Sequence, residues 1–414
     1  MDIKEKLDRL KREINQNQKL ASTEDKSKII SKLRILQREQ IKEQERIKDI
    51  DKLAEYFGAE VNENAFGRFL VKEQLKKSDY LGENIEQIHL LTKEKLFKNF
   101  KLDNNVFLDV ETSGLTGGVG TFAFLIGIGY LDNGEFRIKQ FFLPDLPYEK
   151  ALLTELSSIL ANFDSITTFN GKSFDLPLLT SRFRLQMLTE PLFNLHLDLL
   201  HVARRVYKRS FEDRSLSSLE EKLLDTPRIG DIAGNLIPEI YFNFLRTGEV
   251  SLLNKVIKHN EIDVFSMLRL LAYFVDLLER IEEIKTPEVL YSISRLTHEL
   301  KDTETTITLM KRALRFTDDI PLIFEIKRDL SLIFKRKSRW NEAERLWLEL
   351  LDETPLEPFP YLELAKLYEH TFKQLNKAVE ILERLKEKLG YGWEFCRADD
   401  LVKRDERLKK KMEQ

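Results

Sequence analysis

The chain has 414 residues, of which 42% are hydrophobic and 33% are charged, and its 67 Lys and Arg against 70 Asp and Glu leave a formal net charge of −3. This length predicts two or three domains, and the composition excludes a collagenous, disulfide-stapled or wholly disordered chain. A net charge this close to zero provides no general attraction to nucleic acid, so any such binding must come from a local basic patch.

Cysteine usage and hydropathy predict where the protein works. The single cysteine, Cys396, excludes an intrachain disulfide and fits a reducing compartment. No apolar run reaches the roughly 18 residues that a membrane span requires, and the N-terminus is charged, unlike a signal peptide. We therefore expect a soluble cytoplasmic protein with no membrane partner.

Residues 1–57 contain neither Pro nor Gly and are rich in Lys, Glu, Gln and Arg. Their apolar residues recur at helical spacing, as in Ile29, Leu33 and Leu36, which predicts a helical N-terminal arm. Two alternatives remain for this arm. Its helices either pack on the main body or form a coiled coil with a second copy or a partner.

From Val106 onward the pattern changes to that of a sheet. The runs VFLDV, AFLIGIGYL and FRIKQFFL predict three consecutive strands, the last two joined by a hairpin turn at Asn133-Gly134. A helix over 148–162, the strand SITTF and further helices follow, over 199–207, 216–224 and 252–281 and from near Phe174. Meandering strands followed by alternating helix and strand predict an α/β fold with a mixed sheet.

The C-terminal third, from about Thr286, has no strand signal. Its small and aromatic positions follow an order that resembles the tetratricopeptide helix pair, which repeats about every 34 residues. These positions are Ser331, Phe334, Ala343, Trp347 and Pro355, and Ala365 and Tyr368 follow the first two by 34 residues. We expect a short array of such repeats over 286–392, with an unrelated helical bundle as the alternative.

Acidic residues mark the ends of two predicted strands. Asp109 and Glu111, in FLDVETSG, are two residues apart on a strand and so reach the same face of the sheet. Such a pair of carboxylates repels unless a cation lies between them. Asp175, in FNGKSFD, begins a helix after an Asn-Gly turn, which places its carboxylate above the end of the sheet.

A third acidic position lies on the long predicted helix near residue 260. His259 and Asp263, in KHNEIDVFSM, are four residues apart and therefore share one face of the helix. Each of the three motifs alone has an ordinary structural explanation, as capping acids or as a surface pair. Their order along the chain is more specific than any one of them.

Together the motifs resemble the DEDD exonuclease superfamily, which has a ribonuclease H-like fold. The layout resembles the YprB-like group, in which such a core precedes tetratricopeptide repeats and which includes a bacterial exonuclease of mitomycin repair. The resemblance covers an exonuclease domain over 100–283. It implies that four acids bind metal and that His259 is the general base; the acids are Asp109, Glu111, Asp175 and Asp263. His259 stands four residues before the last acid, a spacing used by the Tyr-type branch, whereas the His-type branch usually uses five.

The chemistry of phosphodiester hydrolysis supports the same ligand set. Attack by hydroxide requires neutralisation of charge on both the attacking and the leaving oxygen, which two divalent ions supply. Mg²⁺ and Mn²⁺ prefer carboxylate ligands, and an imidazole titrates near neutral pH. With six His and one Cys in the chain, no zinc-binding set is evident.

Several residues near these motifs are candidates for contact with nucleic acid. The resemblance implies that the backbone after Glu111 contacts the terminal nucleotide, and basic residues in the window 201–214 outnumber acidic ones. The candidates are Thr112, Ser113, Gly114, Asn170, Lys172, Arg204, Arg205, Lys208 and Arg209. Asp198 is expected to be a capping or supporting acid, and no role is predicted for Asp231.

These features predict a metal-dependent 3′→5′ exonuclease of DNA repair; the polarity and the preference for DNA over RNA come from the resemblance alone. Stacked helix pairs form concave surfaces, so the repeats are expected to recruit a protein partner, for which a helicase is a candidate. Two alternatives stay open. One is an inactive nucleic-acid-binding scaffold, and the other is an RNA-processing exonuclease.

Overall fold

The structure, a computed structural model, describes residues 46–77, 85–114, 120–390 and 399–412. The predicted arm therefore lies mostly outside the described residues, as do the middle of the Gly-rich segment after Glu111 and the last two residues of the predicted repeats. The chain forms two compact units. The first comprises Met1–Ile85, Asn99–Leu200 and Ser215–Tyr273, and the second Glu86–Lys98, His201–Arg214 and Phe274–Gln414.

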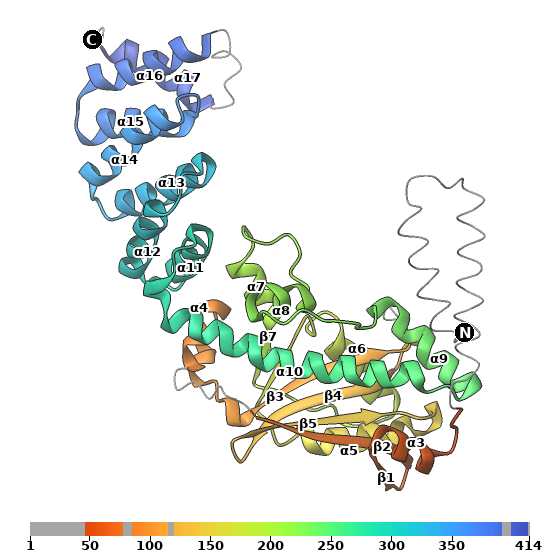
Figure 1. Cartoon of the computed structure of the whole chain (residues 1–414). Coiled ribbons are helices and arrows are strands. Elements are labelled where there is room, and N and C mark those ends of the chain that lie inside the picture. Colours follow the sequence, from red (N-terminus) through yellow and green to blue (C-terminus); the bar gives the residue numbers. More distant parts are fainter. Residues whose placement is uncertain (1–45, 78–84, 115–119, 391–398, 413–414) are drawn as a thin grey trace, which may run out of the picture. The chain divides into compact units, whose positions relative to one another are not determined.

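A mixed seven-stranded sheet forms the centre of the first unit (Figure 1). Its strand order is β1-β2-β5-β4-β3-β6-β7, with antiparallel pairing from β1 to β3 and parallel pairing of β3, β6 and β7. The strands are β1 (Glu60–Asn64), β2 (Gly67–Lys77), β3 (Asn105–Thr112), β4 (Ala123–Asp132), β5 (Glu135–Phe142), β6 (Ser165–Thr168) and β7 (Leu195–Asp198). This topology confirms the predicted ribonuclease H-like α/β fold.

The hairpin predicted at Asn133-Gly134 is present. Asn133 and Gly134 have φ angles of 51° and 85°, and Asp132 pairs with Glu135 across the turn. Positive φ at both central residues matches the twist of the flanking strands, which explains the Asn-Gly sequence.

The sheet extends beyond the four predicted strands, because β1, β2 and β7 also belong to it. The second half of β2 reads VKEQLKK, a charged run with little strand signal. It is held by polar contacts instead: Gln74 and Lys76 both bond to Glu261 on the helix that crosses the sheet. β7 has only four residues, too few for a clear period-two pattern.

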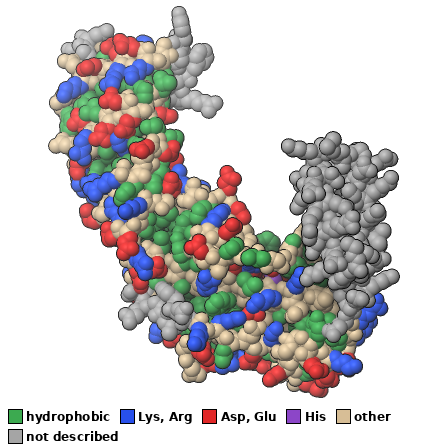
Figure 2. Space-filling model, in the orientation of Figure 1, with side chains coloured by type: hydrophobic (Ala, Val, Ile, Leu, Met, Phe, Trp, Pro, Cys, Tyr) green, Lys and Arg blue, Asp and Glu red, His purple; other side chains and the backbone are tan. Residues whose placement is uncertain are grey.

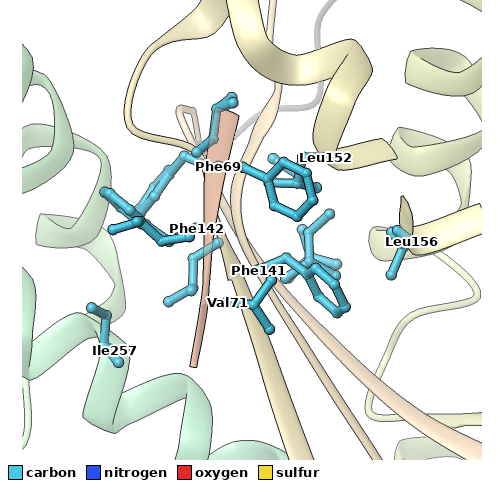
Figure 3. Close-up of a cluster of buried hydrophobic side chains, with 14 of the residues drawn as sticks. Phe69, Val71, Phe141, Phe142, Leu152, Leu156 and Ile257 are labelled. Atoms are coloured by element: carbon cyan, nitrogen blue, oxygen red, sulfur yellow. The ribbon is translucent and has the colours of Figure 1, made fainter. Parts of the chain in front are cut away.

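Helices cover both faces of this sheet. They are α3 (Ile50–Phe57), α5 (Glu149–Leu160), α6 (Asp175–Leu185), α8 (Leu216–Leu224), α9 (Ile237–Thr247) and α10 (Ser251–Glu279), whose last residues belong to the second unit. In Figure 3, Phe69 and Phe141 lie on the side of Leu152 and Leu156 from α5, and Phe142 lies on the other side with Ile257 from α10. This alternation follows from the period-two geometry of a strand.

Two glycines of β4 let α10 approach the sheet closely. A Cβ atom on Gly127 would lie 2.3 Å from the Asn260 side chain, and one on Gly129 would lie 2.6 Å from Val264. Both neighbours are on α10, so the sequence GIG creates the space that this helix occupies. The functional residues of α10 are thereby held against β3 and β4.

The second unit is helical in its described part. Its helices pack as neighbouring pairs, α11 with α12, α13 with α14 and α15 with α16. They are α4 (His89–Thr92), α7 (Leu199–Val206), which begins in the first unit, α11 (Pro287–Glu299), α12 (Thr303–Arg315), α13 (Ile320–Arg336), α14 (Trp340–Glu353), α15 (Pro358–Lys366), α16 (Leu375–Leu389) and α17 (Asp399–Met412). Among the described helices of the whole chain, none is long and apolar enough to cross a membrane.

The positions that resemble the tetratricopeptide pattern lie inside these helix pairs. Ser331, Phe334, Ala343 and Trp347 are buried between α13 and α14, and the Trp347 Nε1 donates a hydrogen bond of 2.8 Å to the Ser331 hydroxyl. The small residue leaves room for the indole ring and satisfies its polar atom. The predicted helical character of the C-terminal third is confirmed.

Candidate active site

The first two acids come from the central strand β3. Asp109 pairs in register with Gly127 of β4, and Gly127 pairs with Gln140 of β5, so the three lie in one row across the sheet. Gln140 donates to Asn260 of α10, and Asn260 donates to Asp109, so this row faces α10. Glu111 is two residues further along β3 and shares the same face.

The third acid follows the turn after β6. Asn170 has a φ of 67°, and a Cβ atom on Gly171 would lie 2.5 Å from Thr168, so the Asn-Gly pair is required for this turn. Asp175 is the first residue of α6, directly after it. Because β3 and β6 run parallel, the carboxyl ends of both strands meet at one edge of the sheet.

Asp198 supports this turn from the end of β7. Its carboxylate accepts hydrogen bonds from the backbone N–H groups of Asn170 (2.9 Å) and Lys172 (3.2 Å). It also accepts one from Leu200 at the start of α7, at 3.1 Å. Asp198 is buried, and its roles are those of a helix cap and a support for the loop that leads to Asp175.

Helix α10 contributes three neighbouring side chains. His259 Nε2 lies 3.6 Å from Asp263 Oδ2 and 3.9 Å from Glu111 Oε1, so the imidazole lies between acids from α10 and β3. Asn260 Nδ2 donates to the Asp109 Oδ2 at 2.8 Å and to the Asp109 backbone oxygen at 3.2 Å. His259 and Asp263 therefore lie on one face of α10, as their four-residue spacing predicts.

Two residues of the loop after α8 complete the cluster. Asp231 receives a hydrogen bond from His259 Nδ1, with distances of 2.8 and 2.9 Å to its two oxygens. Arg228 donates to Asp231 at 3.0 Å and also to Asp263. The tautomer with its proton on Nδ1 satisfies this contact with Asp231, and it directs the Nε2 lone pair toward the acids.

The four predicted acids perturb one another's pKa. Burial raises the pKa of Asp109 well above its ordinary value, and the charges of Asp263 and Asp175 raise it further. Burial and the charge of Asp109 do the same to Glu111. Burial, Asp198 and Asp263 raise the pKa of Asp175 to about 7.

Asp263, the fourth predicted acid, and Asp231 differ from these three because basic side chains contact them. The pKa of Asp263 is raised by burial, although His259 and Arg228 work against that rise. Burial alone would raise the pKa of Asp231, but hydrogen bonds from His259 and Arg228 outweigh it and lower the pKa. Asp231 is therefore the ionised partner of the imidazole, whereas repulsion within the four-acid cluster is offset at Asp263 by basic neighbours.

The donor set of this cluster fits hard divalent cations. Carboxylate oxygens are the ligands that Mg²⁺ and Mn²⁺ prefer, and mutual repulsion among buried acids is relieved by a cation. As the side chains stand, however, no three His, Cys, Asp or Glu residues in the described ranges are arranged to hold a metal ion. Arg228 forms an ion pair with Asp263, one of the four acids.

The candidate nucleic-acid contacts differ in their surroundings. Ser113 is nearly buried and bonds to the backbone of Phe122, whereas Lys172 is exposed beside the Asn-Gly turn. In the second unit, Arg205 donates to the backbone oxygens of Leu91 and Thr92. Arg209 forms an ion pair with Glu325.

The surface charges are otherwise mixed. Arg204 and Lys208 are exposed. In Figure 2, basic and acidic side chains are interspersed on the drawn face of each unit, as the near-zero net charge leads one to expect. On the face that is drawn, contacts to a polyanion would depend on particular residues and on backbone N–H groups.

Three side chains that contact the candidate site have no counterpart in the sequence-based expectations, namely Asp231, Arg228 and Asn260. Asn260 could have been found, because it stands three residues before Asp263 and shares its side of the helix. Asp231 and Arg228 lie in a loop without periodicity, 28 and 35 residues from the side chains that they contact. No local pattern predicts such contacts.

Comparison with known proteins defines the class. Residues 106–275, which contain all four acids and His259, match the RNase_H superfamily. The protein of Bacillus subtilis (strain 168) named "Uncharacterized protein YprB" is 34% identical over 298 residues, which cover 69% of this chain and 70% of the relative. The chain belongs to the YprB family of RNase H-like proteins.

A solved structure gives a weaker likeness. The family B DNA polymerase from the hyperthermophilic archaeon Pyrobaculum calidifontis matches with a TM-score of 0.34 and 14% identity, over 51% of this chain and 29% of the polymerase. The superfamily itself is informative: an RNase H-like domain implies a nuclease or another nucleic-acid-processing activity, and nucleases of this superfamily generally use divalent metal ions.

Proposed function

We propose that this protein is a DEDD-type 3′→5′ exonuclease that hydrolyses phosphodiester bonds of DNA. Asp109, Glu111, Asp175 and Asp263 would hold two divalent ions, Mg²⁺ or Mn²⁺, and His259 would be the general base. The single observation that supports this most strongly is the gathering of four carboxylates, each with a pKa raised by burial, around an imidazole that lies 3.6 and 3.9 Å from two of them. Perturbed acids gathered at one strand edge are typical of a site that binds cations.

The ions, when bound, would supply charge neutralisation for the attacking and leaving oxygens of the phosphodiester. The chain's own residues would supply position and proton transfer. Asp231 holds the Nδ1–H of His259, so the free Nε2 can accept a proton from an attacking water molecule. Asn260 fixes the orientation of Asp109 through two hydrogen bonds.

We assign substrate contacts to the segment after Glu111, to the turn after β6 and to two exposed basic side chains. The backbone at Thr112, Ser113 and Gly114 would contact the terminal nucleotide, and Asn170 with Lys172 would approach it from the turn after β6. Arg204 and Lys208, both exposed, would add phosphate contacts. Arg205 and Arg209 have protein partners, so their contribution to binding would be smaller.

The helical unit would serve recruitment rather than chemistry. Its helix pairs are compatible with a tetratricopeptide-like array, whose stacked pairs create surfaces for a protein partner such as a helicase. A role in DNA repair within the cytoplasm follows from the same proposal.

A nuclease assay on end-labelled substrates tests the proposal. The full chain is incubated with 5′-labelled single- and double-stranded DNA and with matched RNA, in MnCl₂ or in EDTA. The proposal expects a ladder of products that shortens from the 3′ end on DNA, present with Mn²⁺ and absent with EDTA. Faster cleavage of RNA would favour an RNA-processing enzyme because the 2′-hydroxyl then contributes. Binding without cleavage would favour a scaffold.

A further inference from the structure

One basic side chain lies inside the acidic cluster. The guanidinium of Arg228 donates from Nε and Nη2 to the two oxygens of Glu220, from Nη1 to Asp231 at 3.0 Å, and from Nη2 also to Asp263. Its side chain is only 9% exposed. Burial alone would lower the pKa of Arg228, but the bond to Glu220 and the charge of Asp263 raise it, so the group is a permanent cation.

The contact with Asp263 differs in kind from the contact with Glu220. Glu220 is a buried residue of α8 and meets the guanidinium as a two-point fork, the geometry that holds an arginine in a fixed place. Asp263 receives a single bond from the Nη2 atom that already bonds Glu220. Release of Asp263 would therefore leave the bonds of Arg228 to Glu220 and Asp231 intact.

The same bond brings a positive charge to one of the four acids. Among the described residues no three ligating side chains close around one point, and burial, with repulsion from neighbouring acids added to it, raises the pKa of Asp109 and Glu111. A guanidinium that neutralises one oxygen of Asp263 removes part of that repulsion and occupies a position on the carboxylate. The cluster is thus held together by an internal cation.

We propose that Arg228 is a placeholder cation: it neutralises Asp263 in the metal-free protein, and a divalent ion displaces it from Asp263 while Glu220 and Asp231 retain it. This inference rests on the proposed function, because it assigns Asp263 to metal binding. Arg228 and the metal ion compete for one carboxylate, so removal of the arginine strengthens metal binding and weakens the metal-free fold. Arg228 here is a positioning residue.

The size of the effect follows from the bond that the metal ion must break. A hydrogen bond between charged groups corresponds to about a tenfold change in an equilibrium constant, or somewhat more. We expect Arg228→Gln to bind Mn²⁺ about tenfold more tightly than the wild type. In EDTA the variant unfolds at a lower temperature, and its gain in melting temperature on addition of Mn²⁺ is larger.

The experiment measures Mn²⁺ binding by isothermal titration calorimetry and thermal unfolding with and without Mn²⁺, on the full chain and without substrate. Arg246→Gln is the matched control, since Arg246 is an exposed arginine of α9 in the same unit, and it should leave both measurements unchanged. Arg228→Lys is the second variant, in case Arg228→Gln does not fold. Lysine keeps the charge but cannot span Glu220 and Asp263 together, so a smaller gain in affinity is expected.

Two results would overturn the inference in distinguishable ways. If the wild type binds Mn²⁺ and both Arg228 variants bind it equally or more weakly, Arg228 is not a competitor of the metal ion and only this inference fails. If the wild type binds no Mn²⁺ in the millimolar range, the proposed function fails as well. A lower dissociation constant for Mn²⁺ in either variant supports the role of Arg228 as a placeholder cation.

Discussion

Asn260 is bonded to Asp109 at two points, through the side-chain oxygen at 2.8 Å and through the backbone oxygen at 3.2 Å. This contact ties the long helix α10 to the central strand β3. Asn260 is itself fully buried and accepts a hydrogen bond from Gln140, so the orientation of one acid depends on a chain of amides across the sheet. Such supporting hydrogen bonds commonly determine how well a ligand is held.

Replacement of Asn260 should therefore affect both stability and catalysis. Asn260→Ala removes the side-chain partner of the Asp109 carboxylate and one of the two acceptors of the Gln140 amide, which keeps its bond to the Ile257 backbone oxygen. We expect a loss of about 1–3 kcal/mol in unfolding free energy. Turnover should fall more than KM rises, because Asp109 loses its orientation. Asn254→Ala, at an exposed position of the same helix, is the control. Urea unfolding and steady-state kinetics measure the two effects, and unchanged values for both would show that the amide chain is dispensable.

Gly127, which lies opposite the Asn260 side chain, leads to a second prediction. A Cβ atom on Gly127 would lie 2.3 Å from Asn260 and 2.8 Å from Val264, so Gly127→Ala must push α10 away from β4. We expect a loss of about 1–3 kcal/mol in stability, typical of overpacking, together with reduced nuclease activity. Gly120→Ala is the comparison, because a Cβ there meets nothing within 4 Å. Equal melting temperatures for the two variants would contradict the close approach of α10.

Much of this arrangement could be predicted from the sequence because it follows local periodicity. The two-residue spacing of Asp109 and Glu111 fixes their common face, and the four-residue spacing of His259 and Asp263 fixes theirs. The hairpin at Asn133-Gly134 could be predicted because its turn requires positive φ.

The features that escaped prediction depend on contacts between distant segments. The charged half of β2 is held by hydrogen bonds to Glu261, almost 190 residues away in the chain. Its own composition therefore does not predict a strand. Asp231 and Arg228 lie in an irregular loop, and a sequence does not reveal which helix such a loop meets. Nor could it show that Arg209 pairs with Glu325 rather than remaining available for phosphate.

The bond between Asp231 and His259 leads to a third prediction. Asp231→Asn keeps the shape of the side chain but removes the charged acceptor that holds the imidazole. We expect kcat to fall about 10- to 100-fold, the usual range for a supporting partner, with little change in KM. The exposed Asp225→Asn in the same loop should retain full activity. If Asp231→Asn matches that control in kcat, Asp231 does not orient the base.

The raised pKa of Asp175 leads to a prediction about pH and stability. Its folded-state pKa is about 7 against an ordinary value of 3.8, so the folded protein binds more protons than the unfolded chain in that interval. The associated stability is fully present below about pH 4 and is lost as the pH rises through about 7. In EDTA, Asp175→Asn should therefore gain in melting temperature relative to the wild type as pH increases over this range.

Thermal unfolding in EDTA at a series of pH values measures this difference, and Mn²⁺ should reduce it. Asp103→Asn, at an exposed position before β3, serves as the control and should parallel the wild type at every pH. A difference between Asp175→Asn and the wild type that stays constant from pH 4.5 to 8 would show that Asp175 is not titrating in this range.

The most direct test of the central claim compares wild type, Asp109→Asn and Asp103→Asn for cleavage of end-labelled DNA in MnCl₂. Asn is nearly isosteric with Asp, so the variant should remain folded by circular dichroism while it loses one charged oxygen ligand. Since metal-assisted charge stabilisation contributes several kcal/mol to such reactions, we expect Asp109→Asn to be slower by about a thousandfold or more, with Asp103→Asn unaffected. Full activity in a folded Asp109→Asn protein would contradict the account.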